Sequence, residues 1–552
     1  MSEAFDYIIV GAGSAGCVLA NRLTADKKTT VLLLEYGGTD IGPFIQMPSA
    51  LSYPMAMDRY NWGYETIPEQ HLGGRTLDAP RGKVLGGSSS INGMVYVRGH
   101  AKDFDKWEEL GAKGWAFKDC LPYFKRMENA HNGQKGWRGT DGPLHITRGN
   151  QKNPLYKAFI QAGVEAGYVH TTDYNGERQE GFGQMEMTVW KGRRWSSSNA
   201  YLYPIRHRKN LNVRTGALVK KVLFDGIRAI GVEYHGGSQT KIVHARKEVI
   251  LSAGAFGSPT ILQRSGIGDA SQLRTVGIEP KLNLTGVGKN LQDHLELYVQ
   301  YAVSQPITLN GVLNLFSMGR IGLEWLGFKT GLGATNHFES CAFIRSSKGV
   351  EYPDIQFHFL PGAISYDGKS AAKGDGMQVH VGPNRSMSRG QVSVMSGDAY
   401  DAPQIAFHYM SHEQDWINFR RAIRLTREVF AQKAMKPYTL EELLPGHRVE
   451  TNDQLDDFIR KHASSAFHPC STCFMGDEND AKAVVNNECK VIGLEALRVV
   501  DSSIFPQVTN GNLNGPSMMV AEKAADLILG KMPLPASIQK PFEHPNWRHS
   551  QR

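Results

Sequence analysis

The chain has 552 residues, more than one compact core usually holds, so we expect two or more domains. Hydrophobic residues make up 41% of it and charged residues 21%, which is the balance of a water-soluble globular protein. The formal charge of +8 is spread without a run of five basic residues, which excludes a nucleic-acid-binding tail.

The N-terminus carries no targeting pattern. The opening "MSEAFDYIIV" is acidic where a secretory signal is basic, and no run of about twenty apolar residues would span a membrane. Six cysteines in so long a chain are typical of free thiols in a reducing compartment. We therefore expect a cytoplasmic protein without a nucleic-acid partner.

The first sixty residues follow the order that dinucleotide binding requires. "FDYIIV" predicts a buried strand, Gly11-x-Gly13-x-x-Gly16 follows it, and a helical pattern comes next. A second strand, "TTVLLLE", ends at Glu35, whose carboxylate would accept a ribose hydroxyl. The glycines would let the backbone approach a pyrophosphate at the helix N-terminus. A plain tight turn is the alternative, and the pattern does not distinguish NAD from FAD.

Two further segments are rich in glycine and serine. "RGKVLGGSSSINGMVYVRG" (81–99) offers small residues and free backbone N–H groups to a flat ring or a phosphate, with a flexible surface loop as the alternative. "GAFGSPTILQRSGIG" (254–268) follows the predicted strand "EVILSAG". Ser258 and Pro259 are expected to open a short helix there that stops before Gly266, and a simple helix cap is the alternative.

In order and spacing, these segments resemble the signatures of the glucose-methanol-choline family of FAD-dependent oxidoreductases, from residue 5 to about residue 535. The resemblance implies an α/β fold of two domains: a Rossmann-like FAD-binding domain, discontinuous in sequence, and a substrate domain with a mostly antiparallel sheet flanked by helices. The implied division is 1–154, 211–309 and 461–535 for FAD, 155–210 and 310–460 for the substrate, and 536–552 for a poorly ordered tail.

The resemblance also implies which residues contact FAD: Gly11, Gly13, Ser14, Ala15, Gly16, Glu35, Gly86, Gly87, Ser88, Asn92, Gly93, Val219, Ala253, Gly254 and Asp501. Some family members bind FAD covalently through a histidine near the position of Ile91. Isoleucine at this position predicts non-covalent binding.

Between these segments, "PDIQFHFL", "GQVSVMS" and "PQIAFHYM" predict an antiparallel sheet over the flavin. "HEQDWINFRRAIRLTREVF" predicts a long amphipathic helix.

The segment "SSAFHPCSTCFMG" (464–476) contains a histidine and a Cys-x-x-Cys pair. A structural zinc site needs four ligands, and no second Cys/His pair follows at finger spacing. A redox dithiol would belong to a small thioredoxin-like domain, which a flavin signature disfavours. We therefore expect no metal, and we expect Cys470 and Cys473 to pack as small apolar residues.

The histidine of this segment fits a catalytic role. Alcohol oxidation requires removal of a hydroxyl proton, for which an imidazole is a suitable base. His468 resembles the family's catalytic histidine in "His-Pro-x-x-Thr/Ser-x-x-Met-Gly", whereas composition alone favours a buried structural histidine.

Near the C-terminus, "VVDSSIFPQVTNGNLNGPSMMVAEKAADLILG" predicts a strand and then a helix. Asn514 or Gly515 would cap this helix, Pro516 suits its first turn, and Gly530 would end it. The resemblance implies that Asn512, or less favourably Asn514, pairs with the catalytic histidine and orients the substrate oxygen. Two loop asparagines without a role are the alternative.

The strand "LELYVQYAV" alternates apolar and polar residues, so on pattern alone Glu296 is a solvated carboxylate. In choline-oxidising members of the family, an acid at this spacing after an Asp-His pair faces the trimethylammonium group, which carboxylates and aromatic rings recognise. Glu296 matches that acid. Trp62 is expected to be a cage aromatic, with a core tryptophan as the alternative.

The resemblance therefore implies FAD-dependent oxidation of choline to betaine aldehyde, with glycine betaine as a further product. A hydride would pass to N5 of FAD. A respiratory quinone is the favoured electron acceptor and oxygen stays open, as does peripheral attachment to the inner face of the cell membrane. The alternatives are oxidation of medium-chain or aryl alcohols and an FAD-binding protein without redox activity.

Overall fold

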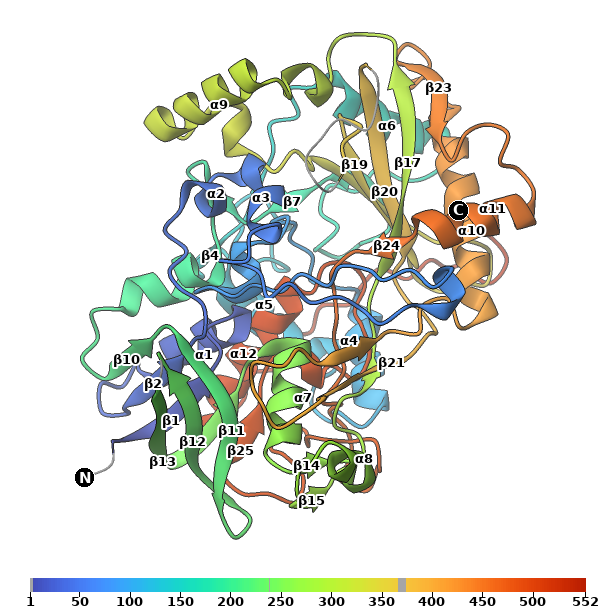
Figure 1. The fold of residues 1–552 in the computed structure, drawn as a ribbon. Helices are drawn as coiled ribbons and strands as arrows, with labels where there is room; N and C mark the ends of the chain where they lie inside the picture. The colour runs from blue at the N-terminus through green and yellow to red at the C-terminus, as the bar shows by residue number, and fades with distance from the viewer. Residues whose placement is uncertain (1–2, 238, 366–373) are drawn as a thin grey trace.

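The computed structural model describes residues 3–237, 239–365 and 374–552. Two large sheets lie at opposite ends of the molecule, the first at the lower left of Figure 1 and the second at the upper right. The first sheet contains both parallel and antiparallel strand pairs and is flanked by helices, whereas the second sheet is antiparallel. The predicted α/β class is confirmed.

The first sheet collects strands from both ends and the middle of the chain. Its order is β10 (Leu211–Arg214), β2 (Val31–Leu34), β1 (Ala4–Val10), β13 (Gln239–Leu251), β12 (Arg228–Gly236) and β11 (Ala217–Asp225), and β25 (Leu497–Val499) pairs with β13. β1, β2, β10, β13 and β25 are parallel. The apolar runs "YIIV" and "VLLL" are buried, as inner strands covered on both faces require. α1 (Ser14–Leu23) and α12 (Asn514–Ile528) pack against each other beside this sheet.

The second sheet is built mainly from the middle of the chain. Its order is β23 (Thr439–Leu444), β17 (Leu295–Val303), β20 (Gly376–Pro383), β19 (Ile355–Leu360), β18 (Ser340–Ile344) and β6 (Gly181–Gln184), and β24 (Ser464–Ser465) pairs with β17. α10 (Glu413–Phe430) and α6 (Pro154–Glu165) pack against it. The predicted strand "IQFHFL" and the predicted amphipathic helix are confirmed.

Two parts of the predicted arrangement differ from the structure. "GQVS" and "QIA" form β21 (Gly390–Ser393) and β22 (Gln404–Ala406), which pair in a separate small sheet with β16 (Lys289–Leu291). β17 belongs to the second sheet, although the predicted boundary at residue 309 assigns it to the nucleotide-binding part. Its cross-strand hydrogen bonds with β20 place it there.

Helix ends follow the predicted signals only in part. α7 (Gly254–Arg264) begins directly after β13, so Pro259 lies inside the helix instead of opening it, and the helix ends at the predicted place. In α12, Asn514 is already helical and Leu513 is the N-cap, so the predicted cap falls too late. Gly530 follows the end of α12, as expected.

Residues 536–552, the tail that was expected to be poorly ordered, contain no helix or strand, but they contact the rest of the chain. The backbone N–H of Ser537 donates to the carbonyl of Lys118 at 2.7 Å, and that of Phe542 donates to the carbonyl of Glu177 at 2.9 Å. Arg552 forms an ion pair with Glu428 at 2.7 Å, and Gln551 donates to the carbonyl of Arg345 at 2.6 Å.

Three further helices lie near one another at the upper left of Figure 1: α2 (Pro43–Gln46), α3 (Ser52–Met55) and α9 (Leu315–Phe328). Across residues 3–237, 239–365 and 374–552, no helix combines the length and the apolar character that a membrane crossing needs.

Candidate active site

A large cavity, with a volume of about 770 Å³, is walled by residues of both sheets. This size is typical of sites for small ligands and cofactors. The predicted FAD and substrate residues that line it are Gly11, Gly13, Ser14, Ala15, Glu35, Trp62, Gly87, Ser88, Asn92, Gly93, Val219, Ala253, Gly254, Glu296, His468, Asp501 and Asn512.

Gly16 and Gly86 lie outside this wall, so the geometry does not support their predicted contact with FAD. A β-carbon on Gly16 would lie 1.9 Å from the carbonyl oxygen of Gly11, so Gly16 allows α1 to pack closely on the end of β1. A β-carbon on Gly86 would lie 2.2 Å from the hydroxyl of Ser90. Both glycines therefore allow close packing behind the glycine-rich turns, on the side away from the cavity.

The first two glycine-rich segments meet backbone to backbone. A β-carbon on Gly87 would lie 2.6 Å from Cα of Gly13, and Gly87 has a φ of +53°. Only glycine fits there without strain. The N–H of Gly86 donates to the carbonyl of Ala12 at 2.7 Å and holds the two segments together.

The start of α1 and the end of β2 supply polar groups to the same wall. α1 begins at Ser14 without an acidic residue in its first turn, so its free N–H groups attract an anion such as phosphate. Glu35 accepts the N–H groups of Ala12 at 2.9 Å and Gly37 at 2.8 Å. Burial raises the pKa of Glu35 to about 7.

Asp501 connects the third glycine-rich segment to the C-terminal part of the chain. Its carboxylate accepts the N–H of Gly254 at 2.9 Å, the hydroxyl of Ser258 at 2.5 Å and the N–H of Ser503 at 2.7 Å. Burial raises its pKa. Asp501 therefore positions the turn at Gly254 on the cavity wall.

These features fit a dinucleotide cofactor. The N-terminus of α1 suits its phosphates, Glu35 suits a ribose hydroxyl, and the surface at Gly13 and Gly87 lets the backbone approach closely.

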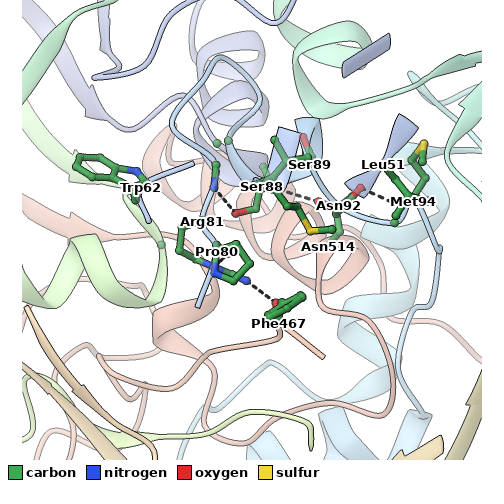
Figure 2. Close-up of a pocket in the computed structure, with 18 of the residues that line it drawn as sticks. Leu51, Trp62, Pro80, Arg81, Ser88, Ser89, Asn92, Met94, Phe467 and Asn514 are labelled. Atoms are coloured by element: carbon green, nitrogen blue, oxygen red, sulfur yellow. Dashed lines mark hydrogen bonds between the residues drawn. The ribbon is translucent and has the colours of Figure 1, made fainter. Parts of the chain in front are cut away.

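His468 lies on the cavity wall in a loop with a fixed backbone. The backbone N–H of His468 donates to the carboxylate of Asp293 at 2.7 Å, and this carboxylate also accepts the hydroxyl of Tyr409 at 2.6 Å. Arg81 donates to the carbonyl of Phe467 at 2.7 Å (Figure 2), and Phe467 has a φ of +64°. These bonds hold the imidazole of His468 toward the cavity.

A chain of hydrogen bonds determines which nitrogen of His468 carries the proton. His294 Nε2 lies 2.9 Å from the carbonyl of Asn384, which can only accept, so His294 is protonated on Nε2. His294 Nδ1 then accepts from His468 Nδ1, 3.0 Å away. His468 Nε2 keeps its lone pair and accepts from the amide of Asn512 at 3.0 Å. This is the form that a general base needs.

Burial keeps the imidazoles of His294, His358 and His468 neutral. It lowers the pKa of His294 to about 4 and that of His358 to about 4. Burial also lowers the pKa of His468 well below its ordinary value, and repulsion from Arg81 and from any proton on His294 or His358 lowers it further. His468 is therefore unprotonated at neutral pH.

Asn512, and not Asn514, adjoins the histidine. Asn512 Oδ1 accepts from Gln356 Nε2 at 3.3 Å, which turns its amide N–H groups toward His468. Asn514 accepts the hydroxyl of Ser14 at 2.7 Å, so it belongs to the glycine-rich side of the cavity.

Ring side chains from three paired strands form the opposite wall. In register, Tyr298 of β17 faces His380 of β20, which faces His358 of β19, so all three side chains lie on the cavity face. The rings of Tyr298 and His380 are 4.0 Å apart, and Phe338 meets His380 edge-on at 5.3 Å. Glu296 lies 3.1 Å from His380 Nδ1.

Glu296 is buried on the cavity wall, so the pattern-based interpretation of a solvated carboxylate is wrong. The alternation of β17 separates two covered faces: Leu297 and Val299 pack in the core, while Glu296 and Tyr298 face the cavity. A carboxylate next to aromatic rings suits a quaternary ammonium group.

Trp62 lines the cavity, but its contacts differ from those of Glu296. Its ring stacks on Tyr64 with centroids 5.6 Å apart and lies 5.1 Å from Tyr36, the residue after Glu35. In Figure 2, it stands at the edge of the drawn group, apart from the other side chains. These contacts favour a place beside the nucleotide over the predicted place in an ammonium cage.

The Cys-x-x-Cys pair takes no part in the site. Cys470 and Cys473 are buried free thiols in the hydrophobic core, which confirms the prediction that they pack as apolar residues. Burial raises the pKa of Cys470 to about 12. Within the described ranges, no group of three or more His, Cys, Asp or Glu residues could hold a metal ion.

The sequence interpretation gave no role to His294, His358 or His380. One signal was present: in "IQFHFL" and "MQVHVGP", a glutamine and a histidine two residues apart interrupt apolar strands. Residues with this spacing share a strand face, and polar residues on one face of a buried strand indicate a lined cavity.

The chain belongs to the GMC oxidoreductase family, since residues 5–296 match its N-terminal and residues 386–521 its C-terminal family domain. The resemblance noted in the sequence is thereby confirmed. It is 59% identical over 547 residues to the oxygen-dependent choline dehydrogenase of Brucella anthropi, covering 99% of this chain and 100% of that protein. The protein of the same name from Sinorhizobium fredii is 57% identical with the same coverage.

Solved structures show the same fold. Pyridoxine 4-oxidase from Mesorbium loti has a TM-score of 0.87 and 30% sequence identity, covering 96% of this chain and 100% of that one. A formate oxidase structure has a TM-score of 0.90 and 25% identity, covering 96% of this chain and 98% of that one.

Proposed function

We propose that the protein binds FAD and oxidises choline to betaine aldehyde. The observation that carries this proposal is the cavity itself, whose wall joins the glycine turns at Gly13 and Gly87, the pair of His468 and Asn512, and the buried carboxylate of Glu296. The two relatives named choline dehydrogenase, matched over nearly their full length, support the substrate.

Different residues of the cavity bind the ammonium group, bind the substrate oxygen and remove the hydroxyl proton. Glu296 attracts the trimethylammonium group, and Tyr298 and Phe338 offer it aromatic faces. Asn512 donates an N–H to the substrate oxygen, and His468 Nε2 accepts the hydroxyl proton. A bound flavin supplies the two-electron acceptor.

The same residues serve a second oxidation. Hydrated betaine aldehyde presents a hydroxyl group on the same carbon, next to the same ammonium group. His468 can accept its proton in the same way, and transfer of a hydride from that carbon to a flavin reoxidised after the first step would give glycine betaine.

The cofactor is held non-covalently in this proposal. Ile91 lines the cavity and packs with Ile45, Tyr60 and Val84, and its alkyl side chain offers no nucleophile to a flavin. Acid precipitation should release all flavin into the supernatant, whereas flavin that stays with the protein pellet would contradict this part.

The division of the chain follows the two sheets in this proposal. Because β17 pairs with β20, the FAD-binding part comprises 1–154, 211–294 and 461–535, and the substrate part comprises 155–210 and 295–460. Limited proteolysis with and without flavin tests this division.

Two electron acceptors have support. The sequence resemblance favours a respiratory quinone, which would place this cytoplasmic protein at the inner face of the cell membrane. The names of the relatives favour oxygen. One hydrogen peroxide per two-electron oxidation in air, hence two per choline converted to glycine betaine, identifies oxygen, while quinone reduction without peroxide identifies the quinone.

The substrate is tested with purified, flavin-loaded protein and choline, benzyl alcohol or 1-octanol. Formation of betaine aldehyde with much slower turnover of both uncharged alcohols supports the proposal. Faster turnover of either uncharged alcohol would overturn it, because Glu296 would then not select the substrate.

A further inference from the structure

α9 carries an unusually apolar outer surface. Leu315, Phe316, Leu323 and Phe328 are 86%, 84%, 72% and 78% exposed, although helix surfaces normally carry polar residues. Among the residues of this helix, Trp325 is buried, and its indole N–H donates to the carbonyl of Gly192 at 2.6 Å. In Figure 1, α9 projects from the upper left of the molecule, above α2 and α3.

The two faces of α9 have different surroundings. Met318, Ile321 and Trp325 line the cavity, whereas Phe316 and Leu323 do not. Phe316 and Leu323 are seven residues apart, two helical turns, so they lie on one side of the helix. The helix thus separates the cavity from the exterior and is apolar toward both.

Exposed apolar side chains also lie on α2 and α3, which lie beside α9. The hydroxyl of Tyr53 lies 4.0 Å from the sulfur of Met318, and Tyr53 stacks on Phe44 with centroids 5.2 Å apart. Phe44, Tyr53 and the preceding Ile41 are all exposed, at 40%, 45% and 68%. We call this set of exposed apolar side chains, made of Ile41, Phe44, Tyr53, Leu315, Phe316, Leu323 and Phe328, the apolar collar.

Basic side chains accompany the apolar collar. Arg320 is exposed on α9 itself, between Phe316 and Leu323. Exposed Lys191 and Arg193 flank Gly192, whose carbonyl holds Trp325, and exposed Arg59 follows α3. The exposed acids on the same elements are Asp58 and Glu324. The local balance is therefore positive, like the +8 of the whole chain.

We propose that the apolar collar docks the protein onto the surface of an anionic lipid bilayer. Exposed leucine and phenylalanine side chains on a helix enter the headgroup and acyl boundary, and flanking cations bind anionic headgroups. A second copy of the chain is the other possible occupant, but the positive balance would repel an identical patch. Docking would place α9 between the cavity and the lipid, with its outer side on the bilayer and its other side on the cavity.

This inference does not rest on choline being the substrate. Vesicle binding is measured without any alcohol, so failure of the docking and failure of the proposed reaction are distinguishable.

The test is flotation of the full-length, flavin-loaded protein with vesicles of phosphatidylglycerol and phosphatidylethanolamine in equal parts. The double variant F316E/L323E is compared with I227E/I242E, a matched pair of exposed isoleucines in the β11 to β13 region, 56% and 52% exposed. Neither pair lines the cavity, so choline turnover in solution should be unchanged in both variants.

The proposal predicts that the wild type and I227E/I242E float with the vesicles and that F316E/L323E binds about tenfold more weakly. Vesicles of phosphatidylethanolamine alone should bind the wild type more weakly, because they lack the anionic headgroup. The proposal is overturned if the wild type does not float, if both double variants bind equally, or if F316E/L323E instead abolishes a dimer that does not bind vesicles.

Discussion

The two ends of the cavity are built in opposite ways. The nucleotide end consists of backbone: the turn at Gly13 and the start of α1, which follow β1 directly, and the turn at Gly87, which meets Gly13. The substrate end consists of side chains from segments far apart in sequence, such as Glu296, His358 and His468. The geometry of the nucleotide end depends on local backbone conformation. The geometry of the substrate end depends on strand pairing and on the protonation states of buried side chains.

Because the two ends of the cavity are built differently, they tolerate different substitutions. Backbone N–H groups bind a phosphate whatever the neighbouring side chains are. The nucleotide end therefore tolerates most side-chain changes, but not those that add atoms where two backbone segments approach each other. At the substrate end, each imidazole is fixed by its neighbours, so the loss of one side chain changes the charge or the tautomer of the next.

The largest effect is expected from His468→Ala. It removes the base while leaving the nucleotide end intact, so the rate of flavin reduction by choline should fall about 10²- to 10⁴-fold. Rapid-mixing absorbance under anaerobic conditions measures this rate, and the flavin content of the purified variant is the control. A rate within threefold of the wild type, roughly the scatter of such comparisons, would assign the proton to another group.

Glu296→Gln keeps the shape of the side chain and removes its charge. Losing one partner of a buried charge contact costs about 3 kcal/mol, so kcat/KM for choline should fall about 100-fold. The uncharged isostere of choline, with carbon in place of nitrogen, should react equally with both proteins. Equal losses for the two alcohols would show that Glu296 only supports the fold.

Gly87→Ala examines the nucleotide end. The new β-carbon would lie 2.6 Å from Cα of Gly13, and such overpacking should weaken FAD binding by about 2 kcal/mol, roughly 30-fold. Gly226→Ala is the matched control, because Gly226 has a similar φ of +56° with open space around it. Fluorescence titration of the apoprotein with FAD measures both. Similar losses in the two variants would mean that backbone strain, and not the approach of Gly13, is responsible.

The buried imidazoles predict that stability falls in acid. His358 has a pKa of about 4 in the folded protein and an ordinary value of 6.5 when unfolded, so the unfolded chain takes up the proton first. The stabilising effect of the neutral ring is complete above about pH 6.5 and is lost as pH falls toward 4, by about 2 kcal/mol at about pH 5. His358→Gln should therefore reduce the drop in urea midpoint between about pH 7 and pH 5. An unchanged or larger drop in this variant would contradict the assignment.

The smallest effect is expected for Trp62→Phe. Because Trp62 packs beside Tyr36, the residue after Glu35 at the nucleotide end, FAD affinity should fall a few-fold, about 1 kcal/mol, and the KM for choline should stay within about twofold. Kinetics with saturating FAD separate the two. A selective rise in KM for choline would instead support the cage role expected from the sequence.

Much of the nucleotide end could be predicted from the sequence, because the glycine motifs at 11–16 and 254–268 each follow a strand, β1 and β13, that can be recognised by its apolar run. The packing of Gly16 and Gly86 against neighbouring backbone and side chains could not be predicted, since the same glycine can face a ligand or a neighbouring backbone and only the packing decides. The substrate end was predicted only where the resemblance named a residue, as for His468 and Glu296.

The ring residues of the substrate end could not be found in this way. The position of His380 opposite Tyr298 and His358 depends on the register of three strands that are separated by long segments. The tautomer of His468 depends on the carbonyl of Asn384, a backbone group that has no signature in any sequence.

The proposed reaction is tested most directly by adding choline anaerobically to the flavin-loaded protein and to His468→Ala and following the visible absorbance of oxidised flavin. We expect complete and rapid loss of this absorbance in the wild type and a slow loss in the variant. Oxidised flavin that persists in the wild type with saturating choline would contradict the claim that one cavity joins the two ends for this reaction.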